Sequence, residues 1–236
     1  MYEHSANLYD FIHSFKEYET EAEHIHRLIQ AHQRVDSRTL LDVGCGTGQH
    51  LFYLQDKYQI MGLDLDAGLL AVARDRLPNV TFHEGNMQDF DLAQTFDVII
   101  CLFGAIAYVQ TLKALEATLT AFARHLNPNG VLLLEPFIKP EDYTPGIVHS
   151  LYRDEPHLKV ARFSNSTVDK NRMIALFHYL VGSSDSIDYF TEMHELGLFT
   201  SEEILDALES AGFVDVQSPS IEVFRRGIYV GIRSGQ

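Results

Sequence analysis

The sequence contains no tryptophan, only two cysteines and few basic residues, and these shortages limit what the protein can do. Cys45 and Cys101 show no disulfide pairing pattern, which favours a reducing compartment and predicts a cytoplasmic protein. Eighteen lysines and arginines stand against 33 aspartates and glutamates, giving a net charge of −15. An acidic chain without basic runs is not expected to bind nucleic acid, because phosphate binding needs a basic surface.

Long apolar runs, a signal-peptide pattern and metal-ligand spacings are also missing. Without a long apolar span, we expect no association with a membrane. None of the twelve histidines has the spacing and acidic partner typical of a metal site. His24 and His26 lie two residues apart on a predicted helix and therefore do not share a face. The sequence predicts no bound metal.

What is present indicates an α/β protein. A chain of 236 residues that is 46% hydrophobic can bury one substantial core. Apolar runs alternate with helical patterns, as in a doubly wound parallel sheet. Strands are predicted near 39–43, 58–63, 79–83, 96–101, 131–136, 213–217 and 222–232, and helices near 5–15, 18–33, 51–57, 67–77, 112–125 and from 200 onward. We expect a Rossmann-like fold with a mostly parallel seven-stranded sheet, helices on both faces, and one domain over 1–236.

A glycine-rich turn follows the first predicted strand in the order Asp42-Val43-Gly44-Cys45-Gly46-Thr47-Gly48. Glycines at alternate positions permit positive φ and leave no Cβ, so a ligand can lie against the backbone. A dinucleotide site would have its third glycine where Gln49 stands. The motif resembles the signature of class I S-adenosylmethionine (SAM) methyltransferases. This resemblance implies that Asp42, Gly44, Gly46 and Gly48 lie at the amino-acid end and sulfonium of SAM.

The next two strands end in further candidate cofactor residues. The second predicted strand ends in Asp64, at about the separation where nucleotide-binding α/β domains place the carboxylate that binds ribose hydroxyls. We assign Asp64 and the adjacent Leu65 to the cofactor site, and Asp66 to the cap of the following helix. After the third strand, the resemblance to methyltransferases implies that Asn86 meets the adenine amino group while Met87 packs on the ring.

A β-rich insertion over 137–199 separates the fifth strand from the closing elements. Its alternating segments near 158–168, 171–182 and 187–199 predict antiparallel strands laid over the cofactor end of the main sheet, as a platform for the substrate. The stretch 153–172 holds five cations and three acids within an acidic chain. This pattern suits a phosphate-bearing substrate; the alternative is a set of solvated strand residues.

A narrower resemblance runs along nearly the whole chain. Besides the glycine motif, the segments that carry it are Leu8-Tyr9-Asp10, Lys16-Glu17-Tyr18, Gly85 to Phe90, Glu135-Pro136, Tyr143 to Gly146, His178 to Val181, Leu198-Phe199-Thr200 and Arg226-Gly227. They are similar to the N,N-dimethyltransferases that act on dTDP-linked 3-amino-sugars in macrolide biosynthesis. The resemblance implies that Tyr9 and Tyr18 help to enclose SAM and that the acceptor is a nucleotide-linked amino sugar.

The same resemblance implies the substrate contacts. The family's platform matches a segment containing Arg162, Ser164 and Ser166, and its late arginine matches Arg226. A guanidinium binds phosphate oxygens in pairs, so both arginines are expected to hold the diphosphate bridge. The family's platform histidines also have counterparts in this chain, which adds two candidates for substrate contact, His178 and His194.

Three positions depart from that family. Tyr108 replaces a histidine near the amine, Glu195 replaces an arginine after the platform histidine, and Tyr2 lies close to the position of an N-terminal tyrosine. A neutral primary amine is already a good nucleophile, so the main task is expected to be alignment of nitrogen, methyl carbon and sulfur. Tyr108 is expected to orient the amine or to relay its proton to water, with Glu135 or a platform histidine as second candidates.

Three interpretations are therefore compared. The first is N-methylation of a nucleotide-linked amino sugar, and the second is SAM-dependent methylation of an unrelated small molecule. The third is a NAD-type oxidoreductase or a non-catalytic nucleotide-binding module, which the glycine spacing disfavours. A small-molecule acceptor is the expected partner, and a homodimer is one of the possible assemblies.

Overall fold

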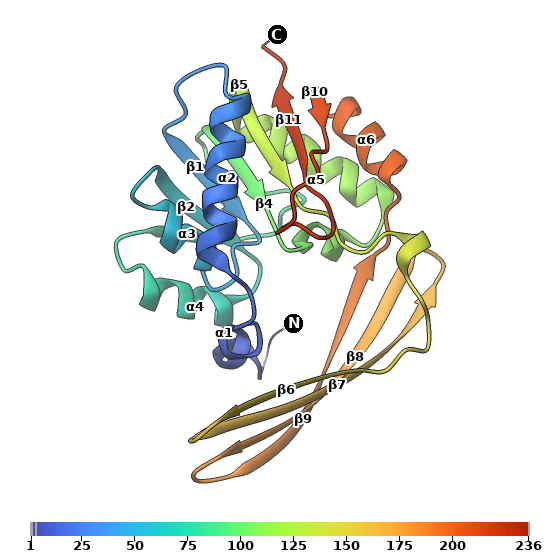
Figure 1. Cartoon of the computed structure of the whole chain (residues 1–236). Helices are drawn as coiled ribbons and strands as arrows, with labels where there is room; N and C mark the ends of the chain where they lie inside the picture. The colour runs from blue at the N-terminus through green and yellow to red at the C-terminus, as the bar shows by residue number, and fades with distance from the viewer. Residues whose placement is uncertain (1, 3, 236) are drawn as a thin grey trace.

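The computed structural model describes residues 2 and 4–235, and its largest element is a seven-stranded sheet (Figure 1). The strand order is β10-β11-β5-β4-β1-β2-β3. Only β11 runs antiparallel to its neighbours, so the predicted mostly parallel sheet is confirmed. The strands are β1 Thr39–Val43, β2 Gln59–Asp64, β3 Thr81–Glu84, β4 Phe96–Cys101, β5 Leu126–Leu134, β10 Phe213–Gln217 and β11 Tyr229–Arg233.

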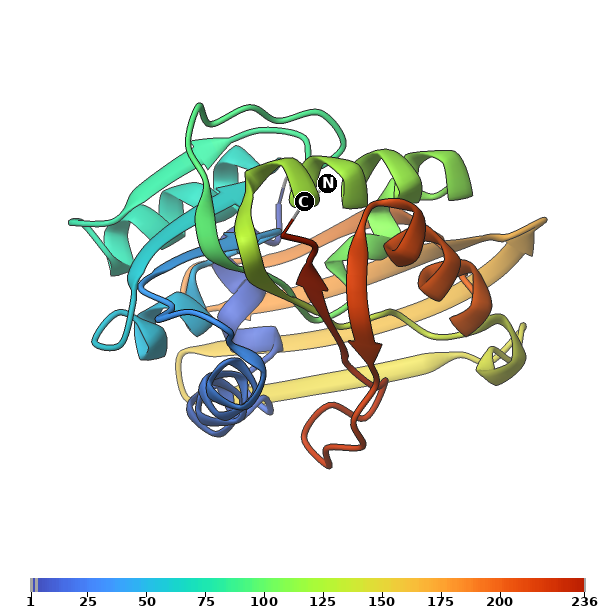
Figure 2. The same cartoon turned by 90° about the horizontal axis from the view of Figure 1, so that it is seen from above.

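Helices cover both faces of this sheet, each over its own apolar core (Figure 2). On one face lie α2 Tyr18–His32, α3 Gln49–Leu54 and α4 Ala67–Arg76; on the other lie α5 Leu112–His125 and α6 Ser201–Ser210. Successive strand residues alternate between the two cores, so Leu40 packs under the first group and Leu41 under the second. Strands buried on both faces explain the nearly continuous apolar runs in the sequence.

Side-chain hydrogen bonds cap the first turns of α4 and α6. The Asp66 carboxylate accepts hydrogen bonds from the backbone N–H groups of Gly68 and Leu69, which caps α4. Thr200 and Glu203 form a reciprocal capping box at the start of α6. The cap assigned to Asp66 from the sequence is confirmed, and the helix predicted from 200 onward is present.

Several boundaries differ from those predicted. The N-terminal helix is broken into η1 Ala6–Leu8 and α1 Tyr9–Ile12, and the last strand begins at 229 rather than near 222. The segment before β11 forms two successive turns instead of a strand, closed by hydrogen bonds from Phe224 N to Ile221 O and from Gly227 N to Phe224 O. The fifth strand begins at 126 rather than near 131, and it includes an irregularity where the pairing with β4 shifts register and Asn129 has a φ of +65°.

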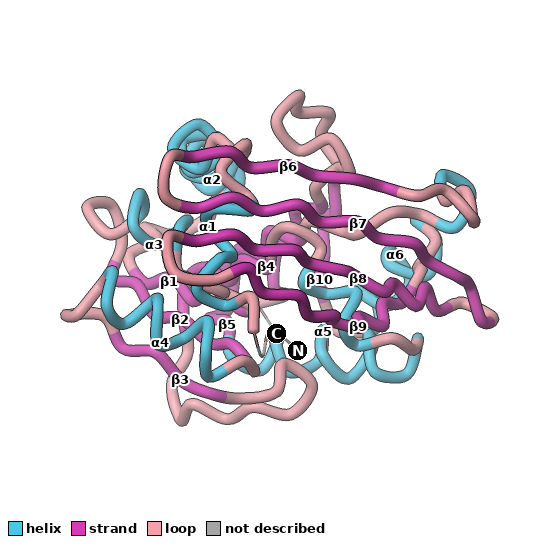
Figure 3. Tube along the Cα trace, turned by 90° about the horizontal axis from the view of Figure 1, so that it is seen from below, coloured by secondary structure: helices cyan, strands magenta, loops and turns pink. Residues whose placement is uncertain are grey.

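The insertion forms a second, four-stranded antiparallel sheet in the order β6-β7-β8-β9. Its strands are β6 His149–Glu155, β7 Leu158–Asp169, β8 Arg172–Ser183 and β9 Ile187–Gly197, and the short helix η3 Pro140–Asp142 precedes them. The sequence indicated three of these strands; β6 was missed because most of this edge strand is exposed and shows little apolar alternation. Figures 1 and 3 show the sheet lying across the carboxyl ends of the main strands.

The two faces of the insertion have different surroundings. Alternate residues such as Met173, Ala175, Tyr179 and His194 are buried against the rest of the molecule. The opposite face is open and carries exposed large apolar side chains: Tyr152, Phe163, Leu180, Tyr189 and Met193. Within the described part of the chain, no helix is long and apolar enough to cross a membrane.

Candidate active site

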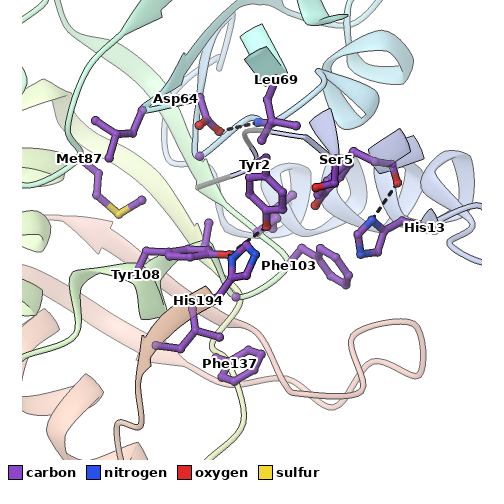
Figure 4. Close-up of a pocket in the computed structure, with 18 of the residues that line it drawn as sticks. Tyr2, Ser5, His13, Asp64, Leu69, Met87, Phe103, Tyr108, Phe137 and His194 are labelled. Atoms are coloured by element: carbon purple, nitrogen blue, oxygen red, sulfur yellow. Dashed lines mark hydrogen bonds between the residues drawn. The ribbon is translucent and has the colours of Figure 1, made fainter. Parts of the chain in front are cut away.

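A cavity of about 380 Å³ lies between the carboxyl ends of the main strands and the inner face of the insertion. It brings together three parts of the sequence: the N-terminal segment, the loops after β1 to β4, and strands β7 to β9 (Figure 4). Parallel α/β sheets commonly bind ligands beyond the carboxyl ends of their strands. The insertion closes this position from the side that the main sheet leaves open.

The glycine turn forms one wall of the cavity. Gly44, Gly46 and Gly48 have φ values of +75°, +55° and +74°, a region that side chains other than glycine rarely enter. A Cβ built on Gly44 would lie 2.7 Å from the Cβ of Ala105, so this position has no room for a side chain. Gly44 and Gly46 line the cavity, whereas Gly48 forms the N-cap of α3 behind it.

Asp64 joins the glycine turn to the next loop. One oxygen of its carboxylate accepts from the backbone N–H of Gly46 at 2.7 Å, and the other accepts from Asp66 N at 2.9 Å. Burial raises the pKa of Asp64, while these hydrogen bonds oppose the shift. Asp64 and Leu65 line the cavity as predicted. The carboxylate is therefore fixed at the end of β2 and faces the cavity.

The turn after β3 supplies the other predicted cofactor residues. Asn86 and Met87 both line the cavity. The side-chain oxygen of Asn86 accepts from the backbone N–H of Gln88 at 3.0 Å, which fixes the direction of the amide. The Met87 methyl lies 3.7 Å from a Cβ built on Gly44, so the methionine is packed beside the glycine turn.

A smaller cavity of about 30 Å³ lies behind the glycine turn, and Asp42, Tyr9, Tyr18 and Phe103 are among its lining residues. Asp42 is 2% exposed, and its carboxylate has no hydrogen bond or ion pair to any described residue. Burial, and secondly the charge of Asp64, raises the pKa of Asp42 to about 8. A cationic ligand group next to this carboxylate would offset the cost of burying its charge.

The N-terminal segment closes the cavity and is fastened to the glycine turn. Asp10 accepts a hydrogen bond from the Thr47 hydroxyl at 2.6 Å and pairs with Arg76, which also contacts the Thr47 carbonyl. Tyr9 faces both cavities, and burial raises its pKa. Tyr18, at the start of α2, lines the smaller cavity and is not among the described residues that line the larger one.

Two arginines also line the cavity, Arg162 and Arg226. Arg162 on β7 lies over the Phe177 ring at 5.0 Å. Arg226, in the loop before β11, lies between the rings of Phe103 and Phe137, at 5.2 and 4.9 Å from their centroids. Burial lowers the pKa of Arg226, but an arginine remains charged at neutral pH. A cavity in an acidic protein thus contains two guanidinium groups.

Most of the predicted positive region lies elsewhere. Arg153 donates to the backbone oxygens of Phe11 and Ile12 and so supports the N-terminal segment. Lys159 pairs with Asp154, and Arg172 pairs with Glu195 at 2.7 Å. Glu195 is thus paired with Arg172 and is not among the described residues that line the cavity.

Three other predicted substrate contacts, His178, Ser164 and Ser166, are not among the described residues that line the cavity, and only His178 faces away from it. His178 lies on the open face of the insertion, where its ring nitrogen contacts the Tyr189 hydroxyl at 2.6 Å. His178 is not one of the described residues that line the cavity, because the odd-numbered residues of β8 face inward and its even-numbered residues face outward. Ser164 is buried on the inner face beside the cavity, and the Ser166 hydroxyl is bonded to the Tyr143 hydroxyl at 2.8 Å.

Tyr108 and His194 are brought together inside the cavity. The Tyr108 hydroxyl lies 2.8 Å from Nδ1 of His194 and 2.9 Å from the hydroxyl of Tyr2. Burial raises the pKa of Tyr108 above its ordinary value. The hydroxyl is therefore protonated at neutral pH and is available as a hydrogen-bond donor or acceptor.

Glu135 lies beside the cavity and supports its wall. Its carboxylate accepts from the backbone N–H of Phe103 at 2.7 Å, and Phe103 has a φ of +54°. Glu135 is 4% exposed and is not part of the cavity lining described here. This contact gives Glu135 a supporting role at a residue with strained backbone, and its expected part as a second catalytic group stays a prediction.

Sequence reasoning missed several lining residues: Ser5, His13, Phe137, Phe177 and Tyr179. They come from the N-terminal segment, the loop after β5 and strand β8. An aromatic residue on a strand is usually part of a core, so these side chains carry no local signal for a site. Only the register between distant segments places them in one cavity.

The glycine turn, the carboxylate after β2 and the polar turn after β3 define a SAM-dependent class I methyltransferase, and the methyltransferase domain family matches residues 40–130. The chain is 36% identical over 231 residues to the dTDP-3-amino-3,6-dideoxy-alpha-D-glucopyranose N,N-dimethyltransferase of Streptomyces fradiae, covering 96% of this chain and 90% of the relative. It therefore belongs to the family of dTDP-amino-sugar N,N-dimethyltransferases.

Solved structures agree with this assignment. The crystal structure of DesVI from Streptomyces venezuelae matches with a TM-score of 0.90 at 32% identity, covering 97% of this chain and 98% of the other. The SAM-bound amino pentose methyltransferase of Micromonospora echinaspora matches with a TM-score of 0.83 at 37% identity, covering 93% and 92%. The cofactor is SAM, and the oxidoreductase interpretation is set aside.

Proposed function

We propose that the protein transfers methyl groups from SAM to the amino group of a dTDP-type nucleotide-linked amino sugar. The observation that carries this proposal is the single cavity that joins the glycine turn to Arg162 and Arg226. A diphosphate between a nucleoside and a sugar needs compensation of its charge, which two guanidinium groups supply. The named activity of the Streptomyces fradiae relative supports the same acceptor class.

The cofactor residues follow from the placement of each side chain. We assign Asp42 to the α-ammonium group of SAM, because this carboxylate is buried without a partner among the described residues. Asp64 is assigned to the ribose hydroxyls and Asn86 to the adenine amino group, with packing from Leu65 and Met87. The remaining cofactor assignments are Tyr9, Tyr18, Gly44 and Gly46 as walls of the site, and Gly48 as the residue that shapes the turn.

SAM, when bound, supplies the electrophilic methyl group, and the protein's own task is to position the acceptor. Holding reacting atoms about 3–3.5 Å apart and in line can remove several kcal/mol of the barrier. We assign Arg162 and Arg226 to the diphosphate, and Tyr108 with His194 to the amine. Ser166 is assigned an indirect role in acceptor binding, because its hydroxyl is hydrogen-bonded to the Tyr143 hydroxyl. Residues 137–199 thus serve as the substrate-binding insertion of one domain.

A methyl-transfer assay tests the proposal. The protein is mixed with SAM and with three acceptor classes: dTDP-amino sugars, simple amines and small carboxylic acids. Mass spectrometry should show a gain of one or two methyl groups only on the nucleotide-linked sugars. SAM binding with transfer only to another acceptor class would support the second interpretation, methylation of an unrelated small molecule.

We also propose that two copies pair through the open face of the insertion. A flat antiparallel face can pack on its own copy around a two-fold axis. Tyr152, Leu180, Tyr189 and Met193 on this face are 49–64% exposed, which is unusual for a set of large apolar side chains on one surface. Light scattering should report a dimer, and Leu180→Glu should yield a monomer. A monomeric wild-type protein at micromolar concentration would contradict this pairing.

The expected compartment and partners also stay predictions. Cys45 and Cys101 are both free and buried, which is compatible with the cytoplasm. The net charge of −15 still disfavours nucleic acid as a substrate. The acceptor is therefore proposed to be a small molecule.

A further inference from the structure

A continuous chain of hydrogen-bonding side chains crosses the cavity, and it joins three segments that are far apart in the sequence (Figure 4). The Tyr2 hydroxyl lies 2.9 Å from the Tyr108 hydroxyl, which in turn lies 2.8 Å from Nδ1 of His194. Tyr2 comes from the N-terminal segment, Tyr108 from η2 Ala105–Val109, and His194 from β9. All three side chains line the cavity.

A buried carboxylate follows His194 in this chain of contacts. Glu192 precedes His194 by two residues on β9 and therefore lies on the same face. One of its oxygens lies 3.8 Å from Nε2 of His194, an ion-pair distance, and the two residues are only 5% and 4% exposed. The same carboxylate accepts from the Ser5 hydroxyl at 2.7 Å and from the backbone N–H groups of Ser5 and His4 at 3.0 and 3.2 Å.

The charge of Glu192 sets the direction of these hydrogen bonds. Burial favours the neutral acid, but the contact with His194 and the hydrogen bonds from Ser5 and His4 prevail, so the pKa of Glu192 is lowered and the group is a carboxylate at neutral pH. A negative charge beside Nε2 favours the tautomer that carries its proton there. Nδ1 is then an acceptor for the Tyr108 O–H, and Tyr108 accepts from Tyr2. A carboxylate, an imidazole and a hydroxyl in this order can move a proton.

We propose that Glu192 and His194 form a proton relay through which Tyr108 removes the proton from the methylated amine, which allows a second methyl group to be added. This inference rests on the proposed function. After the first transfer the acceptor is a secondary ammonium without a free lone pair. One N–H bond breaks as the proton passes to the Tyr108 oxygen, and the Tyr108 O–H proton passes to Nδ1 of His194. The amine regains its lone pair, and the imidazolium is compensated by Glu192.

The surroundings suit this direction of transfer. Burial raises the pKa of Tyr108, so its hydroxyl passes a proton on but does not remain as a phenolate. The imidazole of His194, protonated at Nε2, keeps a lone pair on Nδ1 that can take up the proton. The proton leaves to water when the cavity opens for product exchange.

The ratio of singly to doubly methylated product measures the relay. His194→Gln keeps an acceptor for Tyr108 but cannot take up a proton, so the second transfer should slow by roughly 100-fold and monomethylated product should accumulate. Glu192→Gln keeps an oxygen for the Ser5 hydroxyl and should slow the second transfer by roughly 10-fold. The matched controls are His178→Gln and Glu195→Gln, whose side chains lie outside the cavity among the described residues.

A measurement that does not depend on methyl transfer checks the arrangement itself. Long-range ¹H–¹⁵N spectra of the ligand-free protein should show the His194 ring protonated at Nε2, with Glu192→Gln weakening this preference and His194→Gln identifying the signal. A wild-type ring protonated only at Nδ1 would overturn the relay, as would unchanged product ratios in both variants. If the wild-type protein methylates no amino sugar, the proposed function fails, and the spectra still decide the hydrogen-bond direction.

Discussion

The two ends of the cavity are built in different ways. At the cofactor end, main-chain atoms and one carboxylate come from short loops that directly follow parallel strands, as Gly44, Gly46 and Asp64 do. At the acceptor end, side chains such as Arg162 and His194 project from one face of an antiparallel sheet, and Arg226 joins them from a distant loop. The first end depends on local backbone conformation; the second depends on register and face. Changes at the two ends should therefore affect different ligands.

The largest expected effect is at the glycine turn. Gly44→Ala places a Cβ 2.7 Å from Ala105 at a φ of +75°, so the loop must move and SAM affinity should fall by more than about 100-fold. Calorimetric titration with SAM measures this loss. Gly146→Ala is the matched control, because its φ is +78° but a Cβ there meets no atom within 4 Å. Equal SAM affinities of the two variants would show that the close approach at Gly44 is unimportant.

The acceptor end should respond selectively to loss of a guanidinium. Arg226→Met keeps an apolar stem between the rings of Phe103 and Phe137. The KM for a nucleotide-linked acceptor should rise by roughly 100-fold, because a charge-assisted contact to phosphate is lost, while SAM affinity stays unchanged. Arg172→Met, outside the cavity beside Glu195, should leave both values unchanged. A normal acceptor KM in the Arg226 variant would show that Arg226 does not bind the diphosphate.

Removal of the cavity hydroxyl should lower kcat rather than raise KM. Tyr108→Phe keeps the ring but loses the contacts to Tyr2 and His194, and kcat should fall by roughly 10- to 100-fold because the amine loses an orienting partner. Steady-state kinetics with a dTDP-amino sugar provides the test. Tyr189→Phe removes a hydroxyl bonded to His178 on the open face and should have no effect on turnover. Full turnover by Tyr108→Phe would show that Tyr108 does not act on the amine.

The smallest expected effect is at Asp42, where one substitution should raise the stability of the protein and lower its affinity for SAM. The pKa of Asp42 is raised from 3.8 to about 8, so the folded protein keeps a proton that the unfolded chain releases. The stability of the ligand-free protein should therefore fall as pH rises from about 4 to 8. Asp42→Asn removes this penalty and should raise stability at pH 8 by roughly 1–3 kcal/mol. SAM affinity should drop about 10-fold, because the partner of the ammonium group is lost.

Thermal unfolding at pH 5 and pH 8 checks this prediction. Asp97 is the control, since hydrogen bonds from Arg38, Thr39 and Asn127 outweigh the effect of burial and lower its pKa. Its ionised form stabilises the folded state, and that stabilisation is lost as pH falls through the lowered pKa. Asp97→Asn should therefore destabilise the protein at both pH values. If Asp42→Asn were also destabilising at pH 8 without ligand, the buried charge at Asp42 would not be a cost.

The difference between the two ends also explains what the sequence could predict. The glycine turn, Asp64 and the cap at Asp66 follow from residues close together in the chain, and the structure places all of them as expected. The insertion is harder because β8 has apolar residues on both faces, such as Met173 inward and Leu180 outward. Its alternation therefore could not show which face meets the ligand, and His178 was assigned to the wrong one.

Side-chain contacts between segments that are distant in the sequence could be predicted even less. The hydrogen bonds from Tyr2 through Tyr108 to His194 join the N-terminal segment, η2 and β9, which are far apart in the sequence. Nothing in the local sequence around Glu192 distinguishes it from an exposed acid on a strand, and its role depends on the N-terminal segment that lies over it. Such pairings are set by tertiary packing, which a single sequence does not reveal.

The most direct test of the account compares one amino sugar in two forms. The wild-type protein is supplied with SAM and either a dTDP-linked amino sugar or the same sugar without its nucleoside diphosphate, and kcat/KM for methyl transfer to nitrogen is measured. The account predicts a preference of at least about 100-fold for the linked sugar, because Arg162 and Arg226 have a diphosphate to bind only in that form. Equal values for the two sugars would contradict it.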